Sequence, residues 1–194
     1  MNRRGADRTG PLGSSGVIAQ WGASSLIKSV QHLTPVMTSA SSVTSTITAV
    51  VPENTVIVVT GFTNGGVSQN DMYASVVLTN STTLTTSRNT TSGSAGHSYG
   101  TTIGVEVVEY FPGVIKSVQR GTATLASVPS NVTITAVNWN KSFIHRLGWR
   151  CNNTNAPTTY IEMYPYIASS TLIQWYNGTA ASIIDFNYQV VEFF

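Results

Sequence analysis

Charged residues, cysteine and long apolar runs are all scarce in this chain. Asp, Glu, Lys and Arg make up 9% of its 194 residues and leave a net charge of +2, against about 25% charged residues in a typical soluble protein. Nucleic-acid binders need a dense basic surface to neutralise phosphates, so we expect no nucleic-acid partner. No run approaches the about 20 apolar residues of a membrane-spanning helix, so we expect no membrane partner either.

The single cysteine, Cys151, excludes an internal disulfide framework and a zinc site built on paired cysteines. Arg3, Arg4 and Arg8 lie near the start of the chain without an unbroken apolar segment after them, so no secretory signal is visible. We interpret residues 1–25 as an extended N-terminal arm that lies along a partner, because such a segment cannot bury a core by itself.

Short motifs recur in the same order along the chain, at offsets between about 83 and 88 residues. The matched segments are 27–31 with 115–119, 47–50 with 134–137, 55–62 with 142–149, 81–84 with 169–172, and 107–110 with 190–193. We interpret the chain as a tandem duplication, with a first repeat over 26–112 and a second over 113–194. The short Pro112-Gly113 junction leaves little slack, so we expect the two repeats to pack as a fixed pair.

Each repeat carries runs rich in Val, Ile, Thr and Tyr that are separated by Gly, Asn, Ser and Pro, which is typical of β-strands. The expected strands are 26–33, 43–51, 55–61, 72–79, 82–87 and 101–111, then 114–119, 131–138, 142–148, 159–165, 171–176 and 183–193. The predicted fold class is all-β: two tandem antiparallel β-sandwich or jelly-roll-like units, related by internal duplication and preceded by the arm.

Catalytic patterns are weak. His145 and Cys151 could form a nucleophilic dyad, but six residues along a strand do not establish contact, and a half-buried thiol beside a surface imidazole is the simpler interpretation. A glycosidase needs two carboxylates at about 5–10 Å across one cleft, whereas Glu106 and Glu109 differ by an odd number and point to opposite faces of a strand. We predict no catalytic residue, no metal site and no cofactor, and therefore no enzyme.

Two charged positions recur in both repeats. Glu109 and Glu192 are equivalent, so we assign them a structural role at the end of a sheet. Lys28 and Lys116 are equivalent as well; they either protect a strand edge or form a salt bridge to a partner.

Aromatic residues are unevenly divided, since 12 of the 18 follow Pro112. Trp149, Trp175 and Tyr176 could form a surface for a glycan or another protein, because Trp and Tyr contribute much of the burial at both kinds of interface. The alternative is that the second core is packed with larger residues.

The second repeat resembles small β-rich virion proteins of tailed bacteriophages. The similarity lies in Ile115–Gly121 (IKSVQRG), Thr133–Val137 (TITAV), Ser142-Phe143 near Leu147-Gly148, Ser169–Leu172 (SSTL) and Tyr188–Phe193 (YQVVEF). The resemblance implies a non-enzymatic structural component of the particle, usually a trimer. The first repeat is more divergent and has His32-Leu33 where the second has Arg120-Gly121.

We therefore expect a capsid decoration or cement protein, made in the bacterial host cytoplasm and located in the virion. Its expected partners are itself, as a homotrimer, and the major capsid protein or other virion subunits, with Arg3, Arg4 and Arg8 of the arm contacting the capsid. The alternative is a component of a tail fibre, spike or other appendage that recognises host surface glycan through Trp149, Trp175 or Tyr176.

Overall fold

The computed structural model describes residues 25–38, 40–64, 73–88, 100–125, 130–151, 163–177 and 184–194. All but the last residue of the predicted arm, 1–25, lies outside these ranges. The described part is built from β-strands in antiparallel sheets, with 3₁₀ turns and no α-helix. The predicted all-β, antiparallel fold class is confirmed.

The strands divide between two halves of the chain. The first half contains β1 (Ile27–Leu33), β2 (Val36–Met37), β3 (Ser42–Thr46), the 3₁₀ turn η1 (Pro52–Asn54), β4 (Thr55–Asn64), β5 (Ala74–Asn80), β6 (Thr83–Arg88) and β7 (Thr101–Tyr110). The second half contains β8 (Ile115–Leu125), β9 (Ser130–Thr133), the 3₁₀ turn η3 (Trp139–Lys141), β10 (Ser142–Cys151), β11 (Met163–Ser169), β12 (Leu172–Asn177) and β13 (Ile184–Phe193).

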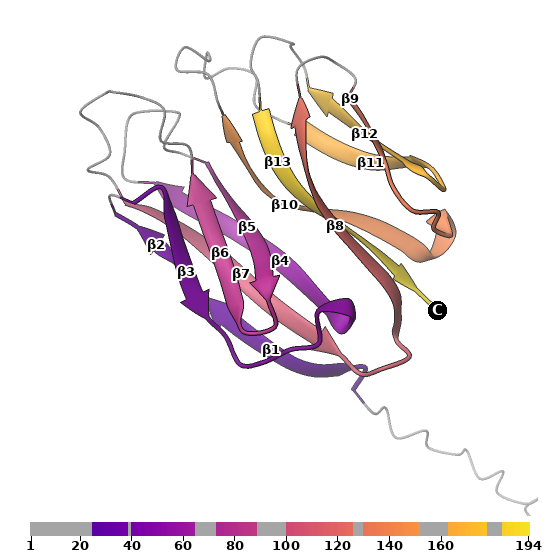
Figure 1. Ribbon diagram of the computed structural model, residues 1–194, viewed down its shortest axis with the longest axis horizontal. Helices are drawn as coiled ribbons and strands as arrows, with labels where there is room; N and C mark the ends of the chain where they lie inside the picture. Colours follow the sequence, from indigo (N-terminus) through magenta and orange to yellow (C-terminus); the bar gives the residue numbers. More distant parts are fainter. Residues whose placement is uncertain are drawn as a thin grey trace, which may run out of the picture.

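The two halves share one sheet. Its six strands follow the order β3-β6-β5-β10-β13-β8, so three strands come from each half, and they lie side by side across the molecule (Figure 1). The link is the pairing of β10 with β5, through Gly148 and Ser75. A first sheet, of β1, β7, β4 and β2, belongs to the first half, and a third sheet, β11-β12-β9, belongs to the second.

Side-chain alternation explains how one sheet serves two cores. Phe186, Tyr188 and Val190 of β13 point into the core of the second half, whereas Gln189 and Val191 are fully buried on the opposite face. Successive side chains of a strand point to opposite faces, so β13 is covered on both sides. The strands of the second half that join the shared sheet therefore contact the third sheet on one face and the first half on the other.

The same local contacts recur in both halves. Ile47 and Val50 donate backbone N–H groups to Thr82 and Ser81, and Ile134 and Val137 donate to Thr171 and Ser170 in the same way. The Gln31 amide is bonded to the Thr48 backbone through both its oxygen and its nitrogen, as Gln119 is to Thr135. A tandem duplication would place equivalent bonds in both halves, as is found here, and the duplication itself stays a prediction. The bonds also pair Ser81 with Ser170, one position beyond the match found in the sequence.

The predicted strands 43–51 and 131–138 both end earlier than expected, and for the same reason. The run 131–138 ends as a strand at Thr133, because the backbone N–H groups of Ile134 and Val137 turn to the β11–β12 hairpin carbonyls. The run 43–51 ends as a strand at Thr46, because the backbone N–H groups of Ile47 and Val50 turn to the β5–β6 hairpin carbonyls. Ile47 and Val50 nevertheless stay in the core, which is why their apolar pattern resembled a strand. Of the expected strand 159–165, residues 159–162 lie outside the described ranges, and β11 continues beyond the expected end, over Met163–Ser169.

The difference between Arg120-Gly121 and His32-Leu33 has a packing explanation at its second position. Gly121 is paired with Tyr188 across β8 and β13, and a Cβ at Gly121 would lie 2.5 Å from the Tyr188 hydroxyl oxygen. The first half pairs Leu33 with Val105 at the same place. A small and a large residue thus replace two medium ones, which conserves the volume of the core.

Candidate functional site

Several polar side chains of the described residues come together where the second half meets strand β4. Antiparallel pairing uses the backbone groups of alternate residues, so β4 bonds to β7 on one side and directs the groups of Thr55, Ile57 and Val59 away from it. Thr55 and Ile57 are fully buried, and a buried backbone group without a partner costs about 1–3 kcal/mol. This edge of β4 therefore needs partners from elsewhere in the chain.

Three neighbouring side chains of the shared sheet supply those partners. Arg120 on β8, Gln189 on β13 and His145 on β10 are paired across the strands and form one row. The Gln189 side chain accepts the Ile57 N–H at 3.2 Å and donates to the Ile57 carbonyl. We call this contact between the row and the β4 edge the junction.

Arg120 and His145 complete the row at its two ends. The Arg120 guanidinium donates to the carbonyl of Thr55 and, at 3.1 Å, to that of Pro52. The Val59 N–H donates to Nε2 of His145 at 3.3 Å. The row thus contacts three alternate residues of β4, which matches the period of an exposed strand edge.

Burial at the junction lowers the pKa of both titratable side chains of the row, Arg120 and His145. Desolvation lowers the pKa of Arg120 to about 10, although the nearby Glu53 carboxylate opposes the shift. Desolvation, and then the positive charge of Arg146, lowers the pKa of His145. A neutral imidazole is what the geometry requires, because only an unprotonated Nε2 can accept the Val59 N–H.

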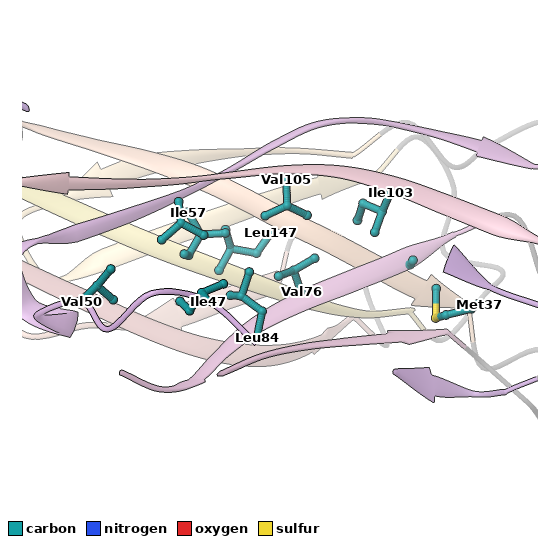
Figure 2. Packing of buried hydrophobic residues seen from close by; sticks show 11 residues of the cluster. Met37, Ile47, Val50, Ile57, Val76, Leu84, Ile103, Val105 and Leu147 are labelled. Carbon is teal, nitrogen blue, oxygen red and sulfur yellow. The ribbon is translucent and has the colours of Figure 1, made fainter. Parts of the chain in front are cut away.

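Apolar contacts surround the polar row. Leu147 of β10 is a second-half residue but packs in the core of the first half, where Figure 2 shows it among Ile57, Val76 and Val105. A second cluster holds Val56 from β4 against Ile115 and Val191 from the second half. The junction therefore combines a shared core residue with hydrogen bonds to a strand edge.

The charged residues that recur in the sequence form two equivalent ion pairs. Lys28 Nζ lies 3.0 Å from Glu109, and Lys116 Nζ lies 2.8 Å from Glu192. Each carboxylate also accepts a backbone N–H, from Val51 in the first case and from Asn138 in the second. The lysines are thus bound to carboxylates within the chain, and both lie on end strands of their sheets, β1 and β8, so the role of protecting a strand edge stays a prediction.

These contacts lower the pKa of both carboxyl groups. Burial alone would raise the pKa of Glu109, but the hydrogen bonds from Lys28 and Val51 outweigh it. The hydrogen bond from Lys116 is the largest cause of the lowered pKa of Glu192. The role assigned from the sequence, at the end of a sheet, agrees with these contacts.

Two of the three aromatics predicted to form an interface lie in the core instead. Trp149 and Trp175 are buried in the second half; Trp149 stacks on Tyr73 and Trp175 packs on Phe186. Neither ring can meet a glycan in this fold, so that interpretation of them is corrected to the alternative of a core with larger residues. Tyr176 lies in β12, but its side chain is outside the described residues, as are Arg3, Arg4 and Arg8.

The catalytic candidates do not converge among the residues that the structure describes. Nε2 of His145 accepts the Val59 N–H. Cys151 lies six residues further along β10, so at the rise of a strand its backbone is roughly 20 Å from that of His145. Glu106 forms an ion pair with His32 at 3.2 Å, on a different face from Glu109. Within the described ranges, no three His, Cys, Asp or Glu side chains lie close enough to hold a metal ion, and no helix there is long and apolar enough to cross a bilayer.

A groove of about 560 Å³ lies beside the junction. Its lining comes from three strands: Val59–Phe62 of β4, Ile144–Arg146 and Gly148 of β10, and Tyr164 and Pro165 of β11. Sequence reasoning found neither this groove nor the role of Gln189. The available signal for the junction was the replacement of His32 by Arg120 between otherwise matching repeats.

No family model, curated protein or solved structure matches this chain.

Proposed function

We propose that this chain is a structural virion protein of a tailed bacteriophage, and specifically a capsid decoration or cement protein. It would act by clamping: interface area buried across capsid subunit boundaries opposes internal pressure without any bond being made or broken. The N-terminal arm, with Arg3, Arg4 and Arg8, would lie over neighbouring capsid subunits. The motifs of the second repeat are the reason for naming a virion.

The single observation that carries a scaffolding role is the junction. Arg120, Gln189 and His145 are side chains that could serve chemistry, yet all three are bonded to the backbone of β4. The repeated carboxylates Glu109 and Glu192 are likewise held by lysines. Polar residues are thus committed to holding two sandwiches together, which suits a protein that transmits load between neighbours.

Capsid occupancy after removal of the arm tests this proposal. Deleting residues 1–20 should abolish or strongly reduce binding to capsids of the phage that encodes the chain, as measured by gel densitometry of purified particles. A full-length variant with Arg3, Arg4 and Arg8 replaced by Ala separates the charge of the arm from its length. Full occupancy by the deletion variant would remove the arm from the proposal.

Antibody labelling of intact particles tests the location. Label at many sites over the head is expected for a decoration protein. Label at one vertex would contradict it and support a tail appendage, and particles without label would contradict both.

The groove beside the junction favours a second candidate, a tail-appendage component that recognises host glycan. Phe62 and Tyr164 bring aromatic rings, and Arg146 a guanidinium, to the lining of one groove. Aromatic faces and a few polar groups are the usual contacts of small-ligand sites. A Tyr164→Ala particle should then lose cell adsorption while Tyr166→Ala, an exposed tyrosine of the same strand outside the groove lining, should not. Unchanged adsorption by Tyr164→Ala would remove this candidate.

A further inference from the structure

The junction has two sides, and the duplication places a counterpart of each side elsewhere on the molecule. One side is the face of β8, β13 and β10; its counterpart is the face of β1, β7 and β4. The other side is the β4 edge with η1; its counterpart is the edge of β10 with η3. Inside the chain, the face of β8, β13 and β10 contacts the β4 edge. In the part of the chain that the structure describes, the two counterpart surfaces, the face of β1, β7 and β4 and the edge of β10 with η3, do not contact each other in this way.

The counterpart face exposes apolar residues that the junction buries. Ile115 is 4% exposed in the junction, whereas its counterpart Ile27 is 38% exposed. Val118 is half-buried against the junction cluster, whereas Val30 is 41% exposed. These two positions of β1 are therefore apolar in both halves but covered in only one, whereas Val56, on the same face of β4, is already packed under the second half.

The polar positions of this face are also uncovered. Gln189 is fully buried, whereas Glu106, its counterpart, forms an exposed ion pair with His32. His32 bonds Glu106 through Nδ1, so in the neutral imidazole its Nε2 is left to accept a backbone N–H from a partner, as Nε2 of His145 does in the junction. We call Ile27, Val30, His32 and Glu106 the front face.

The counterpart edge shows the same contrast. Val56 is 3% exposed under the second half, whereas its counterpart Phe143 is 39% exposed. Trp139, in the place of Pro52, is 57% exposed. Over Ser142–Arg146, β10 pairs with β13, and no described strand pairs with its other side there. We call Trp139, Phe143 and this length of β10 the rear edge; the groove of about 560 Å³ lies along it.

A pair of glycines repeats the comparison at the backbone. Gly148 and its counterpart Gly61 both have positive φ. A Cβ at Gly148 would lie 2.0 Å from the Ala74 carbonyl oxygen of β5, whereas nothing lies within 4 Å of one at Gly61. The space that a neighbouring strand fills at Gly148 is thus open at Gly61, next to a hollow of about 350 Å³.

We propose that the front face of one copy docks on the rear edge of a second copy, repeating between copies the junction found within the chain. Ile27 and Val30 would cover Phe143 and Trp139, and Glu106 would bring a carboxylate to the groove that Arg146 lines. Because the two surfaces differ, the contact is head-to-tail, and each copy can bind one neighbour at each end. This contact specifies how the self-association expected from the sequence would occur. It needs no capsid, so this proposal and the proposed function can fail separately.

Pro165 of β11 limits how much of the internal junction can be repeated between two copies. Pro165 of β11 stands where the first half has Val76 of β5, and proline has no N–H to donate to a neighbouring strand. The contact between copies therefore rests on the front face and the rear edge, without continuation of a sheet through β11.

Complementary surface variants test the proposal. Val30→Asp disables the front face and Phe143→Asp disables the rear edge, while Thr44→Asp places the same charge on an exposed position of β3 outside both. In sedimentation velocity at a protein concentration high enough to populate a weak contact, the wild type and Thr44→Asp should exceed the monomer mass of 20.7 kDa. Val30→Asp and Phe143→Asp should each be monomeric.

Mixing the two variants then distinguishes head-to-tail from symmetric association. An equal mixture should form a species of twice the monomer mass, because each variant keeps the surface that the other lacks. A monomeric wild type, unchanged association of the single variants, or a mixture that stays monomeric would each overturn the proposal. Circular dichroism verifies folding, and Ile27→Asp with Trp139→Asp provides a second pair should either variant unfold.

Discussion

At the scale of single residues, the junction depends on a histidine that must be neutral. His145 accepts the Val59 N–H at Nε2, and both burial and Arg146 lower its pKa. The unfolded chain therefore binds a proton at His145 more readily than the folded protein does. By linkage, the free energy of unfolding contributed by this residue is present above about pH 6.5 and is lost as the pH falls below it.

Replacing His145 should reveal this pH dependence. A glutamine side chain at this position can accept the same N–H through its oxygen without titrating, so His145→Gln should flatten the change in unfolding free energy across the range, about pH 5 to 7.5, in which histidine titrates. His32→Gln, at an exposed position of β1, should leave the change in unfolding free energy with pH as it is in the wild type. Urea unfolding followed by fluorescence measures the effect; an unaltered slope in His145→Gln would contradict the assigned role.

Gln189 provides a test that does not involve charge. Gln189→Ala leaves the N–H and the carbonyl of Ile57 without partners, at a cost of about 1–3 kcal/mol for each unsatisfied group. Glu106→Ala changes the counterpart position, where the ion pair with His32 is exposed and contributes about 0–1 kcal/mol. Equal losses of unfolding free energy in the two variants would show that the junction does not bear on stability.

At the scale of elements, alternation and turn residues predicted most strands but could not predict what covers them. The run TVIVV at residues 55–59 indicates a strand equally well at an edge or in the middle of a sheet. Its partners, Arg120 and Gln189, lie more than sixty residues away, and no local pattern records such a contact. The aromatic excess was visible in the sequence, but whether Trp149 and Trp175 face inward depends on the same long-range packing.

The strand pairing between the halves depends on Gly148, whose φ is +91°. Gly148→Ala would add a Cβ against the Ala74 backbone in addition to the strain of positive φ. Gly113→Ala has the same strain, at φ +87°, but open space around the new Cβ. In urea unfolding, we expect Gly113→Ala to lower the unfolding free energy by about 1–2 kcal/mol and Gly148→Ala to lower it clearly more. Similar losses in the two variants would mean that β5 moves away from the new Cβ without destabilising the protein.

At the scale of the whole molecule, the two halves are predicted to unfold together, because each contributes to the other's buried surface. Leu147 completes the core of the first half from a strand of the second, and the shared sheet runs through both (Figure 1). Calorimetry should therefore show one transition whose calorimetric and van't Hoff enthalpies agree. Two separate transitions would contradict this coupling.

Leu147→Ala should weaken that coupling. Loss of the buried side chain costs about 2–5 kcal/mol, whereas Thr60→Ala, at the exposed counterpart on β4, should cost little. Hydrogen exchange by mass spectrometry should show faster exchange in Leu147→Ala in peptides from β4 and β5 of the first half, although the substitution lies in the second. Faster exchange confined to the second half would contradict the shared core.

The covered edge of β4 determines how readily this protein aggregates. TVIVV is rich in β-branched residues and carries no charge, which is the composition of segments that stack into amyloid-like fibres when their edge is bare. Side chains hide this edge without offering a further strand that could itself recruit others. A substitution that loosens Arg120, Gln189 or His145 would therefore expose this edge to a second copy of the same segment, and the variant protein would be lost as insoluble aggregate.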